Sequence, residues 1–343
     1  MAKTTKITKP SHLASSDSED NVSLESALSE RIEHTAIIGA DLSGLRFDQI
    51  AAKVFPDYSR GKLQTWISSG ELTVNGKTAK TRQKLFSGAE LRLSAEFSPV
   101  SEWQAEDKPI NIVFEDEHLL VINKADNCVV HPAPGLQSGT LVNSILAHCP
   151  SNAALPRGGI VHRLDRETSG VMLIAKTQVA FDHLKAQFRE RTAEKEYHCI
   201  VYGTPRFQSD WIERAIGSDT KHPERMTVVN EGGRESLTYY EVVERFDGFT
   251  HVMCRPKTGR THQIRVHMTA IGHSLVGDRV YRSRRRQHCE IPELAPDPRR
   301  HCLHALRLTV PHPLTQEPLV IEAPMANDME LLLAWLRQNL PAN

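Results

Sequence analysis

The residue types best suited to catalysis lie close together within residues 158–177, which read GGIVHRLDRETSGVMLIAKT. Asp165 stands between Arg163 and Arg166, and an apolar run flanks these charges on each side. Adjacent positive charge favours the ionised form of a carboxyl group, and a carboxylate can attack or deprotonate a sugar carbon. The pattern is equally typical of a plain hairpin, in which a strand, a polar turn and a second strand leave the charges in water. From the pattern alone, an active-site loop and a solvated hairpin are about equally supported.

The HRLDRETSG segment at residues 162–170 also resembles a known signature. It is similar to the HRLDxxTSG motif of the RluA-type pseudouridine synthases, a family whose motif Asp is the catalytic residue. The resemblance implies this role for Asp165, which would either add to C1′ of the target nucleotide or take its C2′ proton. It further implies that Arg163 fills the space vacated by a uridine that is flipped out of its stack.

A second motif follows at residues 258–268, TGRTHQIRVHM. Its local pattern predicts a glycine turn and then a helix with Ile264, Met268 and Ile271 facing inward and Arg265 on the boundary. An ordinary surface arginine would fit this pattern. The run is also similar to a second motif of the same family, and that resemblance implies that Ile264 contacts the base and that Arg265 pairs with the catalytic carboxylate.

A tyrosine lies between the two motifs, in the alternating run KEYHCIVYG at residues 195–203. The alternation predicts a strand in which Tyr197, Cys199 and Val201 share one face. A tyrosine in such a place is usually a packed core residue whose hydroxyl finds a partner. The family has an active-site tyrosine in this KxY context, so the resemblance implies that Tyr197 stacks on the target base and helps to remove the C5 proton.

A chain of 343 residues is long enough for more than one domain to position these groups. We expect an α+β protein with a small S4-type RNA-binding domain followed by a pseudouridine synthase catalytic domain with mixed, largely antiparallel sheet. Residues 1–40 are rich in Ser, Asp, Glu and Lys and predict a disordered tail. The remaining expected divisions are 41–95 for the S4-like domain, 96–109 for a polar linker and 110–343 for the catalytic domain.

The expected S4-like domain is locally basic. Residues 45–92 contain nine Lys or Arg against four Asp or Glu, and such an excess suits a phosphate backbone, although a solvated basic face would look the same. Apolar spacing predicts two helices, followed by short strands at residues 72–74 and 91–93. The order of these elements resembles the S4 module, which implies that Arg60 and Lys62 contact RNA.

The expected catalytic domain opens with INIVFEDEHLLVINKADNCVVHPAPG, which predicts a strand, a charged turn and a strand. It resembles the family motif LLVINKPAGLVVHP, except that residues 125–128 replace Pro-Ala-Gly-Leu in a loop near the expected site. Further sheet is predicted at residues 236–246, 249–256 and 303–310, with helices around Leu184 and at 328–340. Arginines at 282–286 with Arg299 and Arg300 predict a basic insertion loop, which either contacts RNA or is unstructured.

Composition limits the remaining classes of function. Lys plus Arg equals Asp plus Glu at 42 each, so any basic surface must be local. No run of eighteen apolar residues and no secretory signal are present, so we expect a cytoplasmic protein without a membrane partner. The six cysteines form no CxxC pair, which predicts reduced thiols and no metal site. An isomerisation needs no cofactor.

The sequence therefore predicts an RNA pseudouridine synthase, expected as a monomer, that acts on 23S-type large-subunit ribosomal RNA. One alternative is the same chemistry on another structured RNA such as tRNA. A second is a non-catalytic RNA-binding or ribosome-assembly protein. A third is a carboxylate-dependent glycosidase, which would need a second carboxylate, and Glu167 is the nearby candidate.

Overall fold

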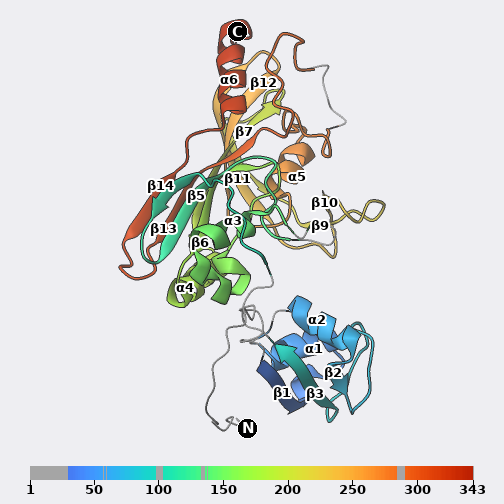
Figure 1. Ribbon diagram of the computed structural model, residues 1–343. Helices are drawn as coiled ribbons and strands as arrows, with labels where there is room; N and C mark the ends of the chain where they lie inside the picture. The colour runs from blue at the N-terminus through green and yellow to red at the C-terminus, as the bar shows by residue number, and fades with distance from the viewer. Residues whose placement is uncertain are drawn as a thin grey trace, which may run out of the picture. The chain divides into compact units, whose positions relative to one another are not determined.

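The computed structural model describes residues 30–56, 58, 60–97, 103–132, 136, 138–283 and 290–342. The chain divides into two compact units, Met1–Val100 and Ser101–Asn343 (Figure 1). Within the described ranges, no helix combines the length and the apolar character needed to cross a bilayer.

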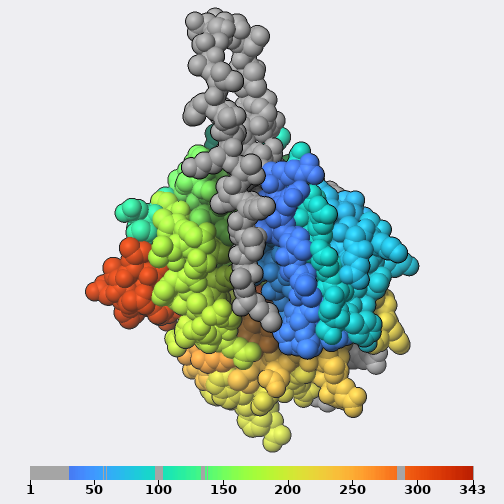
Figure 2. Space-filling view, turned by 90° about the horizontal axis from the view of Figure 1, so that it is seen from below, coloured from blue at the N-terminus to red at the C-terminus, as the bar shows by residue number. Residues whose placement is uncertain are grey.

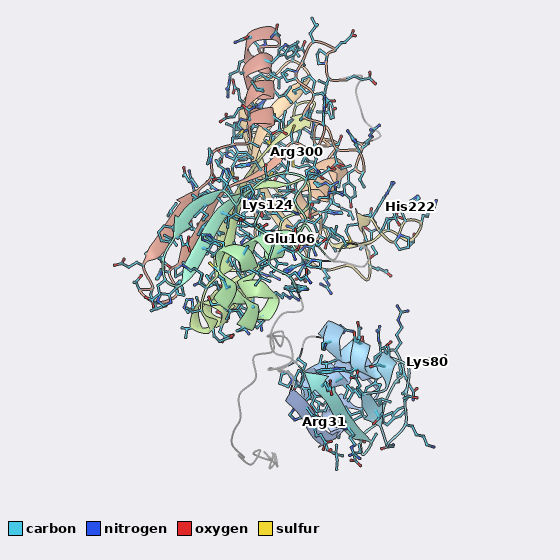
Figure 3. All side chains as sticks on the ribbon, viewed as in Figure 1. Arg31, Lys80, Glu106, Lys124, His222 and Arg300 are labelled. Atoms are coloured by element: carbon cyan, nitrogen blue, oxygen red, sulfur yellow. The ribbon has the colours of Figure 1, made fainter. Side chains whose placement is uncertain are left out.

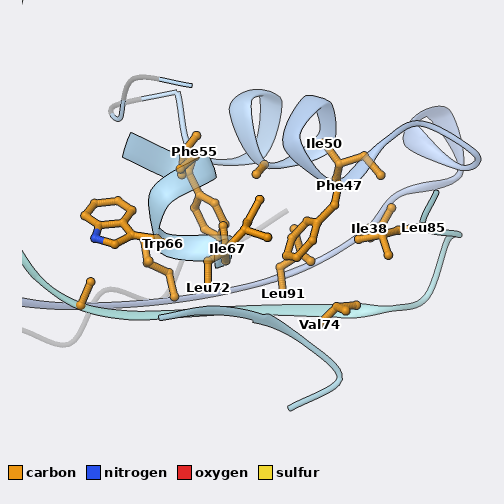
Figure 4. Close-up of a cluster of buried hydrophobic side chains, with 14 residues drawn as sticks. Ile38, Phe47, Ile50, Phe55, Trp66, Ile67, Leu72, Val74, Leu85 and Leu91 are labelled. Carbon is orange, nitrogen blue, oxygen red and sulfur yellow. The ribbon is translucent and has the colours of Figure 1, made fainter. Parts of the chain in front are cut away.

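The first unit packs two helices on a small sheet. Its strands β1 (Glu30–Ile37), β3 (Glu90–Phe97) and β2 (Leu72–Val74) pair antiparallel in that order. The 3₁₀ turn η2 (Ala40–Leu42) leads to α1 (Phe47–Val54) and α2 (Arg60–Ser69). Figure 4 shows Phe47 and Ile50 of α1 and Trp66 and Ile67 of α2 directed toward the sheet. Figure 2 shows one face of this unit, coloured blue to cyan, in a space-filling view.

Strand β1 corrects the predicted tail. Residues 30–37 pair with β3 along their whole length, so the prediction of disorder is wrong for residues 30–40, while residues 1–29 lie outside the described part. Alternate side chains of β1, including Ile32 and Ala36, pack against the core of the unit. Composition missed this strand because the pairing partner lies more than fifty residues further along the chain.

The second unit is built on a nine-stranded sheet. Its strand order is β4-β5-β6-β13-β7-β12-β11-β8, with β14 also paired to β13, and only the β6–β13 pair is parallel. The strands are β4 (Ile112–Glu115), β5 (Leu119–Lys124), β6 (Ser169–Ala175), β7 (Glu194–Tyr202), β8 (Ser209–Glu213), β11 (Leu237–Phe246), β12 (Phe249–Pro256), β13 (Leu303–Pro311) and β14 (Pro318–Glu322). The predicted mixed, largely antiparallel sheet is confirmed.

Helices cover both faces of this sheet. They are α3 (Leu141–His148), α4 (Gln178–Glu190), α5 (Gln263–Ala270) and α6 (Asn327–Asn339), with short 3₁₀ turns η3 (Pro150–Ala154) and η4 (Pro156–Gly159). Leu119 and Val121 of β5 pack with α4, whereas Leu120 and Ile122 pack with α3. Burial on both faces explains why β5 and β6 read as continuous apolar runs without alternation.

The Asp165 segment is not the hairpin that its apolar runs suggested. Of the two expected strands, only β6 forms, because the first run makes a single bridge from Ile160 to Ile174. Gly170, at the start of β6, has φ +116°, and a β-carbon there would lie 2.2 Å from the carbonyl oxygen of Ala305. Glycine therefore allows β6 to approach β13 closely at the end of the Asp165 motif.

The predicted linker at 96–109 is also largely wrong. Strand β3 continues to Phe97, and residues 98–102 lie outside the described part. Trp103 and Ile110 pack on the α3 side of the nine-stranded sheet. Glu106, labelled in Figure 3, makes two hydrogen bonds in the second unit. Its carboxylate accepts the backbone N–H of Gly139 at 2.7 Å, and its backbone N–H donates to the backbone oxygen of Asn143. Most of this polar segment therefore belongs to the second unit.

A two-stranded hairpin projects from the body of the second unit. It consists of β9 (Ile216–Ser218) and β10 (Met226–Val228). His222, in the loop between them, lies well away from the sheet in Figure 3. The loop between the two strands carries Lys221 and Arg225 but also Asp219 and Glu224, so its formal charges balance.

Candidate active site

Three buried side chains fix the loop that carries Asp165. Lys124, at the end of β5, donates to the backbone oxygen of Arg166 at 3.1 Å, and Arg300 donates to that of Glu167 at 2.8 Å. His301 lies 2.8 Å from the hydroxyl of Thr168. Lys124 and Arg300 both lie inside the unit, where burial lowers the pKa of Lys124 to about 8 (Figure 3). Residues before and after the motif thus determine its backbone position.

Asp165 is paired with Arg265 at the start of α5. The Nη1 of Arg265 donates to Oδ2 of Asp165 at 3.3 Å, across a hundred residues of sequence. The Asp165 side chain is 22% exposed, whereas that of Arg265 is 7% exposed. The pairing expected for these two residues is present. The expected boundary position of Arg265 is wrong, because the rest of its guanidinium is directed into the protein.

Asp278 and Tyr281 hold Arg265 from behind. Asp278 accepts two hydrogen bonds from the guanidinium, at 2.7 Å from Nε and 3.1 Å from Nη2, and its side chain is fully buried. Burial opposes ionisation of Asp278, but the hydrogen bonds and charge of Arg265 outweigh it and lower the pKa of this carboxyl. The Tyr281 ring lies 4.8 Å from the guanidinium carbon. Arg265 is therefore fixed before any substrate binds.

His262 is a second neighbour of the Asp165 carboxylate. Its Nδ1 lies 2.7 Å from the Tyr281 hydroxyl and its Nε2 lies 3.8 Å from Oδ2 of Asp165. Burial lowers the pKa of His262, so the neutral ring is favoured. A neutral ring that accepts the Tyr281 O–H at Nδ1 carries its proton on Nε2, on the side of Asp165.

A cavity of about 140 Å³ opens over Asp165. We name it the Asp165 cavity, and its walls come from the catalytic loop, β7, β12 and the residues before and within α5. Asp165 is the single carboxylate among the described residues that line it. The other predicted site residues that line it are Arg163, Tyr197, Ile264 and Arg265. The structure thus brings together all five residues that the sequence assigned to the site.

The pKa of Tyr197 bears on what this residue can do. Burial, together with the negative charge of Asp165, raises the pKa of its phenol well above the ordinary value. The hydroxyl therefore stays protonated near neutral pH. A protonated phenol cannot act as a base, so a stacking role fits Tyr197 better than removal of the C5 proton.

Sequence reasoning missed several of these residues. Lys124 contacts the site through backbone atoms, Asp278 through Arg265, and Tyr281 through Arg265 and His262. No periodicity in the sequence marks these three residues. Arg300 was placed in a basic insertion loop, and this is wrong: its side chain is buried and pairs with Asp328 at 2.6 Å. Residues 284–289, which include most of that predicted loop, lie outside the described part.

One group of potential metal ligands occurs among the described residues, formed by Glu115, His148 and Cys149. The ammonium of Lys176 lies 2.7 Å from the Glu115 carboxylate and already supplies a positive charge there. These residues do not line the Asp165 cavity. The described free thiols, Cys128, Cys149, Cys199, Cys254 and Cys302, form no disulfide with one another.

In the first unit, the two predicted RNA-binding residues have internal partners. Arg60 pairs with the buried carboxylate of Asp48 at 2.5 Å, and half of its side chain is exposed. Lys62 lies 5.6 Å from the centre of the Trp66 ring. Arg60 therefore joins α2 to α1, and its role in the fold must be separated from any contact with RNA.

Comparisons with known proteins agree with this geometry. Residues 118–270 match the family model described as RNA pseudouridylate synthase. The chain is 43% identical over 323 residues to "Ribosomal large subunit pseudouridine synthase D" of Pseudomonas aeruginosa, covering 92% of this chain and 99% of that protein. It is 39% identical over 325 residues to a protein of the same name from Neisseria meningitidis, covering 94% of this chain and 87% of the relative.

Solved structures show the same fold for the second unit. The human RNA pseudouridylate synthase domain containing 4 aligns with a TM-score of 0.54 at 23% identity, over 68% of this chain and 94% of that one. The human RNA pseudouridylate synthase domain containing 1 aligns with a TM-score of 0.50 at 26% identity, over 70% of this chain and 99% of that one.

Proposed function

Because the chain belongs to the RluA-type family of RNA pseudouridine synthases, we propose that it converts specific uridines of large-subunit ribosomal RNA to pseudouridine with Asp165 as the catalytic residue. The observation that carries this proposal is the Asp165–Arg265 pair at the floor of a cavity that holds no other carboxylate among its described lining residues. The substrate class follows from the relatives that are named for large-subunit ribosomal RNA.

The reaction is an isomerisation that balances without a co-reactant. The N1–C1′ bond of uridine breaks, the uracil rotates within the cavity, and a C5–C1′ bond forms. C5 loses its proton and N1 gains one. No redox cofactor or metal is needed by this stoichiometry, and the protein must supply a carboxylate, a binding cavity for the base and a path for one proton.

Asp165 acts on the sugar, either by adding to C1′ or by taking the C2′ proton. Both routes need the carboxylate at a defined point beside the ribose. Arg265 holds the carboxylate at this point. Asp278 and Tyr281 fix its guanidinium, and its Nη1 donates to Asp165. A reacting group held in position by rigid neighbours loses less freedom on reaching the transition state.

The base is bound by the other walls of the Asp165 cavity. Tyr197 offers its ring for stacking and Ile264 provides an apolar contact, and both lie on regular elements, β7 and α5. Arg163 lines the same cavity but is exposed, so it can enter the space that the flipped uridine leaves in the RNA.

The first unit is proposed as the S4-type RNA-binding domain. Its basic excess and its helix pair on a three-stranded sheet support this role, and its boundaries extend to residues 30–97 when β1 is included. Charge reversal at Lys62 is a cleaner test than reversal at Arg60, because Arg60 holds Asp48. Lys62→Glu should weaken RNA binding and flatten its salt dependence, and an unchanged salt slope would leave the basic face without a role in RNA binding.

Two alternatives fit the cavity less well. A glycosidase of the usual type needs a second carboxylate beside the scissile bond, and Glu167 does not line the Asp165 cavity but lies 3.3 Å from His301. A purely RNA-binding protein has no need for a buried arginine aimed at a partly exposed aspartate. The same chemistry on tRNA uses the same residues, so only mapping of the product separates that case.

The direct test is a map of pseudouridine in cellular RNA with and without this protein. We expect specific pseudouridines of large-subunit ribosomal RNA to disappear when the protein is removed and to return with the wild-type chain. The Asp165→Asn chain should not restore them. If pseudouridines disappeared only from tRNA, the substrate would be tRNA and not ribosomal RNA. If none disappeared from any RNA, the proposed function would be contradicted.

A further inference from the structure

A second cavity lies beside the Asp165 cavity and does not contain Asp165. It has a volume of about 310 Å³ and lies among the end of α4, the start of β7 and the end of β12. We name it the basic cavity; its lining residues include Arg191, Glu194, Lys195, Glu196, Arg255, Lys257 and Arg307. Lys195 and Pro256 line both this cavity and the Asp165 cavity, so the two are adjacent.

Positive charge in the basic cavity exceeds the charge that its own carboxylates can neutralise. Glu196 already accepts two hydrogen bonds from Arg255, at 2.9 and 2.7 Å, and lies 3.7 Å from Arg307. Arg307 also pairs with Glu322 on the neighbouring strand. The cavity carries three further cations and one further carboxylate, Glu194, so a net positive charge remains when all of these groups are ionised.

Those three cations are Arg191, Lys195 and Lys257. In the described structure none of them lies within ion-pair distance of a carboxylate. Arg191 ends α4 in the left-handed conformation at φ 63°, and Lys257 follows β12. They come from three separate elements, so their convergence is a feature of the tertiary fold and not of a local run of basic residues.

Lys195 is the central member of this group. Burial, together with the positive charges of Arg191 and Lys257, lowers the pKa of Lys195 to about 8. A half-buried ammonium beside two other cations is unfavourable unless an anion enters. Its Nζ also lies 4.0 Å from the point that a β-carbon on Gly259 would occupy, at the edge of the Asp165 cavity.

We propose that the basic cavity binds a backbone phosphate of the RNA next to the flipped uridine, through Lys195, Lys257 and Arg191. This rests on the proposed function, because the uridine in the Asp165 cavity brings its own backbone to the shared wall at Lys195. A phosphate there fixes the register of the RNA, while the Asp165 cavity recognises the base. A phosphodiester fits better than an apolar or cationic ligand because it matches the unneutralised charge.

The first experiment compares Lys195→Met and Lys195→Arg with wild type in the full-length protein. The probe is a short RNA hairpin that the wild-type enzyme modifies. We expect Lys195→Met to raise KM about tenfold, with kcat within about twofold, and to reduce the slope of log affinity against log salt by about one. Lys195→Arg keeps the charge and should retain the affinity. Lys185→Met, on the exposed face of α4 outside both cavities, is the matched control.

A second measurement separates phosphate binding from damage to the fold. Without RNA, Lys195→Met should raise Tm by about 2–4 °C, because it removes a half-buried charge that two cations repel. A purely structural lysine would give a lower Tm. If Lys195 binds a phosphate, Lys195→Met should therefore bind RNA more weakly and yet unfold at a higher temperature.

Neutral methylphosphonates placed one at a time along the hairpin identify the phosphate concerned. One linkage beside the target uridine should weaken binding to wild type about tenfold, and Lys195→Met should have lost that sensitivity. Inorganic phosphate at millimolar concentration should compete only weakly, since a free anion gains nothing from the neighbouring base. Tight competition by inorganic phosphate alone would assign the cavity to a free anion and overturn the RNA proposal.

The two proposals fail in distinguishable ways. If wild type forms pseudouridine and Lys195→Met keeps the wild-type KM and salt slope, the phosphate site is wrong and the proposed function stands. If wild type forms no pseudouridine in any RNA, the proposed function fails first.

Discussion

Each of the two units contains an aspartate–arginine cluster that joins separate elements, and the two clusters are arranged in opposite ways. In the first unit the Asp48 carboxylate is fully buried, and Arg46, Arg60 and Gln64 donate to it. The two arginine side chains are 38% and 50% exposed. In the second unit Arg265 is the buried member, and the aspartate that it holds, Asp165, faces a cavity.

The difference distinguishes a cluster that holds a fold together from one that presents a reactive group. A buried carboxylate whose hydrogen-bonding capacity is filled by the protein has none left for a substrate. A carboxylate at a cavity wall, held on one side by a buried guanidinium, keeps an oxygen available. The type and pairing of residues are alike in both units, so the direction of exposure decides the role.

The largest effect should come from Asp165→Asn. We expect pseudouridine formation to fall at least about 1,000-fold, because the amide neither attacks C1′ nor takes a proton. The free energy of unfolding should change by less than about 1 kcal/mol, since Arg265 keeps its two hydrogen bonds to Asp278. Release of tritium from C5-labelled uridine RNA measures the activity. Turnover by the purified variant near the wild-type rate would mean that Asp165 is not the catalytic residue.

Asp278→Asn tests the buried half of the same cluster. Removing one partner of a buried ion pair costs about 3 kcal/mol of stability, and Arg265 would no longer be fixed. We expect turnover to fall roughly 100-fold through displacement of Asp165. Activity is measured well below the Tm of the variant, and bound RNA is quantified separately. A variant that loses stability but keeps its kcat would show that Asp165 does not depend on this anchor.

The sequence predicted the parts of the site that are continuous motifs. Asp165 and Arg265 lie in two runs of specified residues, and the resemblance of these runs to family motifs supplied both their roles and the mixed sheet. Lys124 and Asp278 could not be found in this way, because their roles depend on distances across the fold to the backbone of Arg166 and to the guanidinium of Arg265. A buried lysine at the end of an apolar strand was the one available signal.

The errors at the domain boundary have the same origin. Strand β1 looked like part of a polar tail because only its pairing with β3 makes it a strand. Trp103 looked like a linker residue because its partners on the α3 side of the sheet are distant in sequence. Local composition reports the cost of ordering a segment but not the contacts that offset it.

Asp48→Asn should have the next largest effect, confined to the first unit. Burial opposes ionisation of Asp48, but hydrogen bonds from Arg60, Gln64 and Arg46 lower its pKa from 3.8 to about 2. A lowered pKa stabilises the fold above about pH 4, and this contribution is lost as pH falls toward 2. The free energy of unfolding of the first unit should fall by roughly 1–3 kcal/mol at neutral pH in the variant, and its remaining stability should no longer depend on pH between about 4 and 2 through this group.

Hydrogen exchange of the α1 and α2 amides in the full-length protein measures this effect. Exchange in wild type should accelerate between about pH 4 and pH 2, after correction for the intrinsic rate, whereas Asp48→Asn should already exchange faster at pH 7. The kcat on a short hairpin should stay unchanged. A large fall in kcat would mean that the first-unit cluster also acts on the chemistry, and the contrast between the two clusters would fail.

The smallest expected effect concerns Tyr281, which links the catalytic cluster to the β9–β10 hairpin. Its hydroxyl accepts the backbone N–H of Met226 at 3.0 Å and lies 2.7 Å from His262 Nδ1, while its ring lies against Arg265. Tyr281→Phe keeps the ring and removes both polar contacts, each worth about 1 kcal/mol. We therefore expect kcat/KM to fall about fivefold and the β10 amides to exchange faster. Tyr239→Phe, which removes a hydroxyl contact to Glu241 on β11, is the matched control and should leave both quantities unchanged. If Tyr281→Phe behaved like that control, the hairpin would move independently of Asp165, and the catalytic cluster would be as self-contained as the one around Asp48.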